Sequence, residues 1–511
     1  MSGASSPART PSPLASLPVD LLPSLLEPLA FRRADLRNLC LVNQQWNAVA
    51  TPLLYRWIRM FGRDLVNTPA LFEQLAQSPR LCLLVRKLEI RVFPLSMILK
   101  ERWAMEEQAV KVLRQARNVR ELIWTRKGAM SDELRLLLPA TTAVADSLPR
   151  SILEAITDLP NLDSFEFNAS AGIAWTPTLL LKLPRLRSLS VILPDRTVAS
   201  LLPSILANQQ KLAEGDGLGL EELTILCRES PVVNDKIMLE CATALAHGSL
   251  TNLALAGCAK LTNAHLLRLL PSLPKLRHLA LEATGISPSF YTLAAPHLSS
   301  LLSLKITHPG PRHPLLAEFL PSVAHLLRHT PQLHSFTLYH SGSSTGAQGV
   351  REWPVVGSEF IEDLVASVGG GLRKFECSGV LMRISTLVAL TDGARQLRDL
   401  VAHLGHELEL VRSHLSLECL DLNIYRHRTP SDKALRIYPI SKRSTSSLSA
   451  TTSSATTSSP SQSSSSSSLL PRSPFSPPPQ LLAHAQPNRL PQPRLEHQAR
   501  PARSRRRDEQ R

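Results

Sequence analysis

Apolar residues recur along the middle of the chain in a six-residue pattern, apolar-x-x-apolar-x-apolar, which occurs twelve times. The alternation in its second half is typical of a strand with one buried face, and most copies follow an apolar run of helical period that stops at a proline. Self-similarity of this kind predicts a repeat solenoid of parallel strands inside and helices outside. The copies begin at Val85, Val119, Leu162, Leu186, Leu220, Leu250, Leu276, Leu301, Leu333, Leu372, Leu397 and Leu417.

A different apolar pattern precedes the repeats. Leu17-Pro18-x-Asp20 is a helix start signal, because proline and an acidic residue both suit the first turn. A ladder at helical spacing follows, and two prolines within it, Pro23 and Pro28, predict a shortened or bent first helix. The ladder consists of Leu21, Leu22, Leu25, Leu26 and Leu29.

A second amphipathic run extends from Asp35 to Trp46, and a third short helix is expected to end at Thr51-Pro52. Three short helices in ~40 residues enclose little core, because so small a domain leaves much of its apolar surface exposed. Two interpretations fit this pattern. The segment is either a helical cap over the next domain or a docking module that completes its core on a partner.

The residues favour docking, because their order resembles that of an F-box. The resemblance covers Leu17-Pro18-x-Asp20, the leucine ladder, Leu39-x-x-Val42-Asn43-x-x-Trp46 and Pro52-Leu53-Leu54-Tyr55. It implies that the module binds a small Skp-family adaptor and, through it, a cullin. The residues expected at the adaptor are Leu17, Pro18, Leu21, Leu22, Leu25, Leu26, Leu36, Leu39, Val42 and Trp46, some of which must instead form the core of the module.

The repeats resemble degenerate leucine-rich repeats, whose usual length is about 20–29 residues. The segment from Leu250 to Leu270 is particularly regular and resembles the cysteine-containing repeats common behind F-boxes, with Cys258 in a core position. We therefore expect an α/β chain with four parts: a disordered leader at residues 1–13, the F-box-like module at 14–60, the leucine-rich-repeat array at 61–438, and a disordered Ser/Thr/Pro/Arg-rich basic tail at 439–511.

Strand side chains alternate, so the residues between the apolar positions should point to the concave face of the array. In the register of the pattern this face carries eight acidic residues and four Lys or Arg. An acidic-leaning surface should attract a protein with a basic or neutral patch and repel phosphorylated ones. The residues we expect at a bound partner are Glu166, Glu222, His278, Glu282, Lys305, Tyr339, Glu376, Asp399 and Asp421.

The composition indicates where the charge of the chain lies and which cellular compartment suits it. The chain has 57 Lys+Arg against 42 Asp+Glu, and residues 441–511 hold 11 Lys+Arg against 3 Asp+Glu. The basic end at Arg503–Arg507 fits either a nuclear-import signal or a solvated tail, and the tail lacks the aromatic residues that stack on RNA bases. Seven cysteines without a CxxC pair favour reduced thiols in a cytoplasmic or nuclear protein. The sequence has no long uncharged apolar run, so we expect no membrane span.

A search for catalytic chemistry leaves no candidate, and we expect no enzyme, cofactor or metal site. Gly215-x-Gly217-x-Gly219 and Gly369–Gly371 precede strands rather than helices, so neither is placed to hold a phosphate. His403-x-x-His406 lacks the further ligands of a zinc site.

The combined resemblance, an F-box followed by leucine-rich repeats, implies a substrate receptor of an SCF-type ubiquitin ligase. Two alternatives remain open: an F-box/leucine-rich-repeat scaffold that acts without a ligase, and a nuclear nucleic-acid-associated protein that acts through its basic tail, although nucleic acid is the less favoured partner.

Overall fold

The computed structural model describes residues 19–30, 32–60, 68–91, 99–125, 149–169, 177–214, 219–227, 230–246, 248–311, 313–340, 353–404 and 419–424. All of these belong to the first of two units, Met1–Arg443 and Ser444–Arg511. The expected leader and basic tail lie outside the described residues.

The strands form one parallel sheet of fourteen strands, in which β1 to β10 and β12 to β14 follow each other in sequence order and β11 pairs with β12. Each strand therefore pairs with the strand of the next repeat, as in a solenoid. The strands are β1 Trp57–Met60, β2 Lys87–Ile90, β3 Glu121–Trp124, β4 Ser164–Asn168, β5 Ser188–Ile192, β6 Glu222–Leu226, β7 Asn252–Ala256, β8 His278–Glu282, β9 Ser303–Thr307, β10 Ser335–Tyr339, β11 Val355–Val356, β12 Lys374–Met382, β13 Asp399–Leu404 and β14 Cys419–Ile424.

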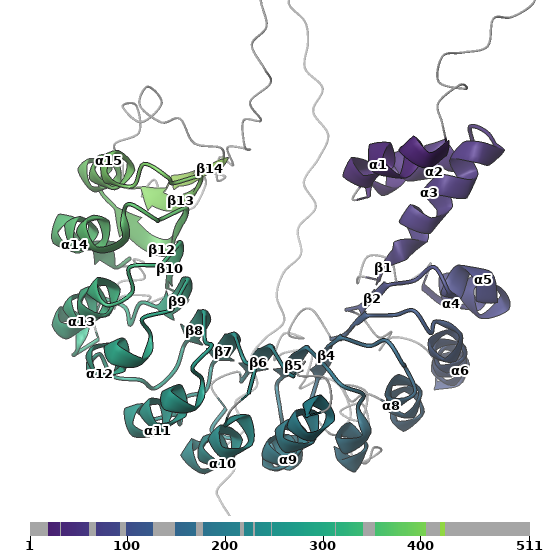
Figure 1. Cartoon of the computed structure of the whole chain (residues 1–511), viewed down its shortest axis with the longest axis horizontal. Helices are drawn as coiled ribbons and strands as arrows, with labels where there is room; N and C mark the ends of the chain where they lie inside the picture. Colours follow the sequence, from purple (N-terminus) through teal and green to yellow (C-terminus); the bar gives the residue numbers. More distant parts are fainter. Residues whose placement is uncertain are drawn as a thin grey trace, which may run out of the picture. The chain divides into compact units, whose positions relative to one another are not determined.

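The repeat helices cover one side of this sheet, and no described helix lies against the other side (Figure 1). We call the uncovered side, which carries Glu222 and Thr224, the open face. The helices of the repeats are α4 Thr68–Gln77, α5 Pro79–Cys82, α6 Leu99–Gln115, α8 Arg150–Thr157, α9 Arg196–Ala213, α10 Asp235–Leu245, α11 Asn263–Leu269, α12 Ser289–Ala294, α13 Leu316–Arg328, α14 Ser358–Val368 and α15 Ile384–Gly393. The predicted α/β fold with parallel strands on one side and helices on the other is confirmed.

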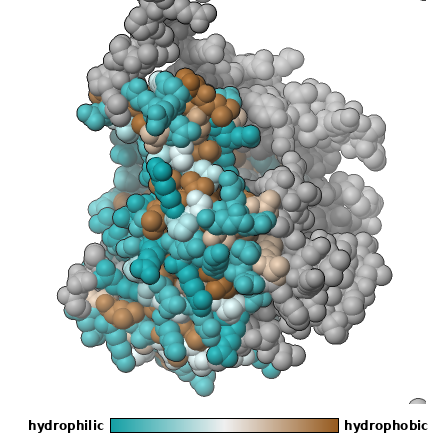
Figure 2. Space-filling view, turned by 90° about the vertical axis from the view of Figure 1, so that its right-hand side faces the viewer, coloured by the Kyte–Doolittle hydropathy of each residue, from teal (hydrophilic) through white to brown (hydrophobic). Residues whose placement is uncertain are grey.

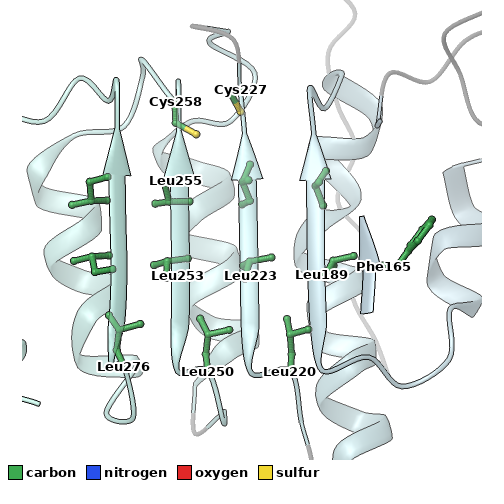
Figure 3. Packing of buried hydrophobic residues seen from close by; sticks show 14 of the residues in the cluster. Phe165, Leu189, Leu220, Leu223, Cys227, Leu250, Leu253, Leu255, Cys258 and Leu276 are labelled. Atoms are coloured by element: carbon green, nitrogen blue, oxygen red, sulfur yellow. The ribbon is translucent and has the colours of Figure 1, made fainter. Parts of the chain in front are cut away.

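The apolar positions of the pattern form the core between sheet and helices. Equivalent residues of successive repeats lie side by side: Leu223 pairs with Leu253 (Figure 3), and Leu253 pairs with Leu279. Each of these side chains is at most 3% exposed. Burying one leucine contributes about 1.5–3 kcal/mol, so the ladder of equivalent residues is the main source of stability of the array. One continuous core runs from Ile58 to Ala402.

Polar caps set where the helices of the repeats begin. The side chain of Asp195 accepts a hydrogen bond from the Val198 amide at the start of α9, 2.9 Å away. That of Asn234 accepts from the Ile237 amide at the start of α10, 3.2 Å away. Each cap satisfies an amide that has no partner inside its own helix.

All twelve predicted strands are present, and two strands were missed. β1 follows directly on the N-terminal helices and has the same pattern, since Tyr55, Ile58 and Met60 are its apolar members. β11 has two residues and pairs with β12 next to a bulge between Cys377 and Leu381. The bulge contains Gly379 with φ +70°, where a Cβ atom would collide with the carbonyl oxygen of His340.

The N-terminal helices, which we call the helical module (residues 19–56), differ in part from expectation. The first helix is short, as its prolines predict: α1, Leu22–Leu26, lies between the 3-10 turns Val19–Leu21 and Glu27–Leu29. The run from Asp35 to Trp46 is not continuous, because α2, Arg33–Cys40, ends before Asn43. The side chain of Asn43 accepts from the Trp46 amide, 2.9 Å away, and so starts α3, Gln44–Arg56. The expected stop at Thr51-Pro52 is wrong, since α3 continues through Pro52.

Candidate functional site

The helical module has a small core of its own. Leu26, Leu36 and Ala50 from the three helices are buried together, and half-buried apolar residues of α2 and α3 pack around them. This core is separate from the continuous core of the repeats. A core of this size leaves the remaining apolar residues of the module at its surface.

The structure divides the residues expected at an adaptor into two groups. Leu22, Leu26 and Leu36 are 0%, 3% and 0% exposed, so they support the module from inside and are not available to a partner. Leu39 and Trp46 are half-buried against the module core.

The second group is open to solvent. Leu21, Leu25 and Val42 are 52%, 53% and 61% exposed. Leu17 and Pro18 lie outside the described residues.

One exposed leucine of the module, Leu41, is not among the residues that the sequence predicts at the adaptor. Leu41 is 85% exposed in the turn after α2. It lies outside the helical ladder, and the early end of α2 is what brings it to the surface. Figure 2 shows apolar residues at the upper end of the described surface, where the module lies, and also at places farther down it. We call Leu21, Leu25, Leu41 and Val42 the apolar module surface.

The open face of the sheet is a second candidate surface, and the predicted register of its residues is confirmed. Pairing places the expected residues in three rows across the strands. The first row contains Glu222, His278 and Asp399, the second Glu166, Lys305, Glu376 and Asp421, and the third Glu282 and Tyr339. The side chain of Asp421 is outside the described residues.

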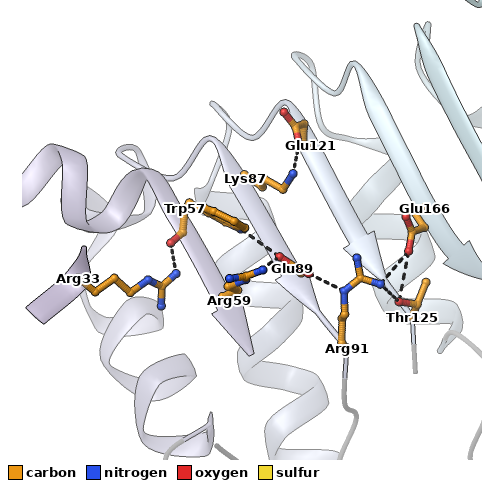
Figure 4. Close-up of polar contacts among 9 residues, drawn as sticks. All are labelled: Arg33, Trp57, Arg59, Lys87, Glu89, Arg91, Glu121, Thr125 and Glu166. Atoms are coloured by element: carbon orange, nitrogen blue, oxygen red, sulfur yellow. Dashed lines mark hydrogen bonds and ion pairs between the residues drawn. The ribbon is translucent and has the colours of Figure 1, made fainter. Parts of the chain in front are cut away.

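At the N-terminal end of the open face, charged residues form a connected network (Figure 4). The carboxylate of Glu89 is 4% exposed and pairs with Arg59 Nε at 3.1 Å and with Arg91 Nε at 2.5 Å. Arg91 Nη1 also contacts Glu166 Oε1 at 3.1 Å. Burial alone would raise the pKa of Glu89, but the hydrogen bonds and charges of Arg91 and Arg59 outweigh it and lower that pKa.

Trp57 completes this network on β1. Its indole Nε1 donates to Glu89 Oε2, 3.2 Å away, and the guanidinium of Arg59 lies 4.3 Å from the centre of its ring. Lys87 lies 5.3 Å from the same ring and also pairs with Glu121 at 2.5 Å. Both Trp57 and Arg59 were missed because β1 was not predicted.

A second group of paired charges occupies β8 to β12. Glu282 accepts from the Tyr339 hydroxyl at 2.5 Å and pairs with Lys305 at 2.8 Å. Burial, followed by the bond to Glu282, raises the pKa of Tyr339. Lys374 pairs with Glu376 at 3.4 Å.

The pairing changes the expected electrostatics of the open face. Five of its eight acidic residues, Glu89, Glu121, Glu166, Glu282 and Glu376, each have a cationic partner on the same face. Among the residues with described side chains, Glu222 and Asp399 have no ion pair, so the unbalanced negative charge is local. Between the two paired groups the second row is uncharged and consists of Ser190, Thr224, Ala254 and Ala280.

A hollow of about 300 Å³ adjoins the C-terminal ends of β8 to β10. His308 is 1% exposed, and burial together with the charge of His340 lowers its pKa to about 4. Its Nδ1 accepts from the Gly310 amide at 3.1 Å, while Nδ1 of His340 donates to the carbonyl of His308. Backbone groups therefore hold the Nδ1 atoms of both histidines, whereas their buried Nε2 atoms have no hydrogen-bond partner among the described residues.

The remaining histidine, glycine and cysteine residues considered for binding or catalysis have structural roles where the structure describes them. His403 Nδ1 accepts from the Gly379 amide, and His406 lies outside the described residues. Gly369–Gly371 form the turn between α14 and β12, whereas Gly215 and Gly217 are not described. Cys258 is buried in the core, and its hydrogen bond with Cys227, together with burial, raises its pKa. Within the described ranges, no group of three or more His, Cys, Asp or Glu residues could hold a metal ion, and no helix could span a membrane.

Comparison with known proteins adds little beyond the fold. No protein-family model and no curated protein matches the chain. Among solved structures it is similar to a chain of the crystal structure of the Rad7 and Elc1 complex in yeast, with 13% identity, a TM-score of 0.35, and coverage of 79% of this chain and 89% of that one. It is also similar to the leucine-rich repeat-containing protein LegL7 from Legionella pneumophila, with 16% identity, a TM-score of 0.35, and coverage of 60% and 89%. At these values neither similarity carries an argument about this chain.

The geometry itself defines the class. The chain is a repeat protein of the leucine-rich type, with a helical module at the N-terminal end of a parallel-stranded array.

Proposed function

We propose that the protein is the substrate-recognition subunit of an SCF-type ubiquitin ligase. The observation that carries the proposal is the apolar module surface, where residues at 52%, 53%, 85% and 61% exposure lie on a module with a core of its own. Several exposed apolar residues on so small a module suit an interaction site, because covering them with a partner removes apolar area from water. The sequence resemblance to an F-box implies that this partner is a Skp-family adaptor, which in turn would bind a cullin.

In this role the array would hold the protein to be ubiquitinated. The uncharged second row from Ser190 to Ala280, with Glu222 beside it, offers a surface for a partner with a neutral or basic patch. The receptor itself would carry out no bond chemistry. It would raise the effective concentration of a substrate lysine near the conjugating enzyme.

The adaptor part is tested by affinity capture. The full chain is compared with a Leu25→Asp, Val42→Asp double variant and with a Leu239→Asp, Leu293→Asp control. The control residues are leucines of α10 and α12 that are 39% and 56% exposed, far along the chain from the module. We expect the parent and the control to capture adaptor and cullin, and the module variant to lose both.

Other results of the affinity capture would point to a different function or contradict the proposal. Capture of the adaptor without cullin would favour a scaffold that acts without a ligase. Equal loss in both variants, or no capture by the parent, would contradict the proposal.

The substrate part is tested separately with a Thr224→Arg, Ala254→Arg variant, which places two bulky charges in the second row. Proximity labelling should lose partners that the parent labels, while capture of the adaptor should be unchanged. Identical partner profiles for parent and variant would exclude this region of the open face as the substrate site.

A further inference from the structure

The residue immediately before each strand belongs to a further row, at the N-terminal edge of the sheet. An unbroken series of backbone hydrogen bonds defines it: the Arg86 amide donates to the carbonyl of Arg56, the Arg120 amide to that of Arg86, and so on to Arg398, with distances of 2.7 to 2.9 Å. The row therefore has the spacing of the sheet, about 4.8 Å from one member to the next.

Arginine dominates this row. Seven of its twelve members are arginines, against two acidic residues, Asp163 and Glu221. The arginines are exposed, and six of them, Arg86, Arg120, Arg187, Arg277, Arg373 and Arg398, follow the module. We call this row the arginine edge. It is distinct from the open face, whose cations are paired with neighbouring carboxylates.

Most of these charges are not neutralised by another residue in the part of the chain that the structure describes. Arg187 pairs with Glu221 at 2.9 Å, and Arg86 donates to the carbonyl of Asn118. No ion pair with another described residue is formed by the remaining four arginines, Arg120, Arg277, Arg373 and Arg398. Unpaired guanidinium groups fixed along one edge are suited to carboxylates or phosphates, which they bind through two parallel hydrogen bonds.

The edge is also hollowed at one place. A cavity of about 480 Å³ lies between the starts of β4 and β5, and Arg120, Arg185 and Arg187 line it together with Asp163. Pro160 and Pro184 also line the hollow, and low-dielectric groups of this kind strengthen the attraction of an anion to nearby arginines. The hollow therefore gives the edge a defined position for one acidic group.

We propose that the arginine edge binds an acidic segment of a partner protein, with one carboxylate in the hollow beside Arg120. Two observations favour a protein over a nucleic acid. Asp163 and Glu221 interrupt the row, and a uniformly charged phosphate backbone would meet them with repulsion, whereas a peptide places its charges selectively. No Phe, Tyr or Trp occurs among the described members of the row, so bases would lack the large aromatic rings on which single strands stack.

The proposal does not depend on the adaptor or on a ligase, and it adds a surface to the one suggested for the substrate. An acidic segment bound at the edge and a neutral or basic patch bound at the open face would be complementary features of one partner. Their binding would differ in salt dependence, because charges exposed at the edge are screened by salt.

The test uses the full chain and a short fluorescent peptide of alternating Glu and Ser, with a Lys/Ser peptide and a single-stranded oligonucleotide of equal charge magnitude as comparison probes. The variants are Arg120→Glu at the hollow, Arg277→Glu farther along the edge, and the control Arg268→Glu, an exposed arginine of α11. Thermal unfolding checks that all three fold like the parent.

We expect the acidic peptide to bind the parent at low salt and to be released as salt rises. Arg120→Glu should weaken this binding about tenfold, Arg277→Glu should weaken it less, and Arg268→Glu should leave it unchanged. Adaptor capture should be the same for all variants, so failure here is distinguishable from failure of the proposed function.

Three results would overturn the proposal: no binding of the acidic peptide, equal weakening by Arg120→Glu and Arg268→Glu, or tighter binding of the oligonucleotide than of the peptide with the same dependence on Arg120. The last would assign the edge to nucleic acid.

Discussion

The indole N–H of Trp57 donates a hydrogen bond to the buried carboxylate of Glu89, 3.2 Å away. This bond joins β1, the strand into which the module leads, to β2, the first strand of the predicted array. Glu89 is the acceptor for two arginines as well, so a single carboxylate holds together the first two strands at the open face.

Replacing Glu89 with Gln should therefore destabilise the protein by about 2 kcal/mol, because Arg59 and Arg91 would both lose their charge-assisted hydrogen bonds to this buried carboxylate, although Arg91 would keep its ion pair with Glu166. The control is Glu121→Gln, whose ion pair with Lys87 is about half exposed and should contribute less than about 1 kcal/mol. Chemical denaturation measures both free energies of unfolding. Equal small losses would show that Glu89 contributes no more than a surface residue.

The effect of Glu89 should also depend on pH. Its pKa is lowered from 4.5 in the folded protein, so the stabilisation is present above that value and is lost as pH falls through the lower folded pKa. The difference in unfolding free energy between the parent and Glu89→Gln should therefore shrink on acidification. A difference that stays constant down to strongly acidic pH would contradict this assignment.

His308 should make stability depend on pH in a different window. Its pKa is about 4 in the folded protein and 6.5 when unperturbed, so between these values the unfolded chain binds a proton that the folded chain does not. Stability should fall as pH falls through this window, by up to about 3 kcal/mol. His308→Asn, which keeps an acceptor for the Gly310 amide, should lose less stability on acidification than the parent. His297→Asn, at an exposed position, should behave like the parent, and parallel curves for all three proteins would disprove the role of His308.

The cysteines should differ in their reaction with iodoacetamide. Five of them, Cys82, Cys227, Cys241, Cys258 and Cys377, are at most 1% exposed, whereas Cys40 is half-buried. Burial raises the pKa of Cys82 to about 11 and contributes to raising that of Cys241 to about 12, so thiolate is scarce there. Mass spectrometry should find Cys40 modified before these five in the folded protein. Rapid modification of Cys227, whose pKa is lowered by its bond to Cys258, would show that this site opens.

Asn43→Ala should weaken the helical module by removing the cap of α3. The lost bond to the Trp46 amide is expected to cost about 1 kcal/mol, and hydrogen exchange of the α3 amides should accelerate accordingly. Asn38→Ala, on the exposed surface of α2, is the matched control and should leave exchange in α3 unchanged. Unaltered exchange in Asn43→Ala would mean that packing alone sets the start of the helix.

The sequence determined the strands far better than the surfaces. The twelve predicted strands are correct because the apolar pattern fixes which side chains face the core, and a shift by one residue would bury Glu222 and expose Leu223. The strand β1 was overlooked although Tyr55, Ile58 and Met60 repeat the pattern, because the preceding residues resemble another motif.

The pairing of charges could not be predicted, because it depends on which strands are neighbours and on how long side chains bend. Arg91, for example, reaches Glu166 across an intervening strand. The sequence likewise does not show which leucines of the module are exposed. Leu22 and Leu25 differ only in which side of a single helical turn they occupy. The arginine edge, by contrast, is visible in VRKLEI, VRELIW, LRSLSV, LRHLAL, LRKFEC and LRDLVA as the residue after the first apolar position.

The balanced charges of the open face have a kinetic consequence. A carboxylate beside a cation has little field beyond a Debye length of about 8–10 Å, so a partner approaching this face from a distance would be guided mainly by Glu222 and Asp399. Association there should proceed at the slow rates of neutral encounters, and the lifetime of the complex would be set by short-range fit. Acceleration by electrostatic steering would come instead from the unpaired arginines at the edge of the same sheet.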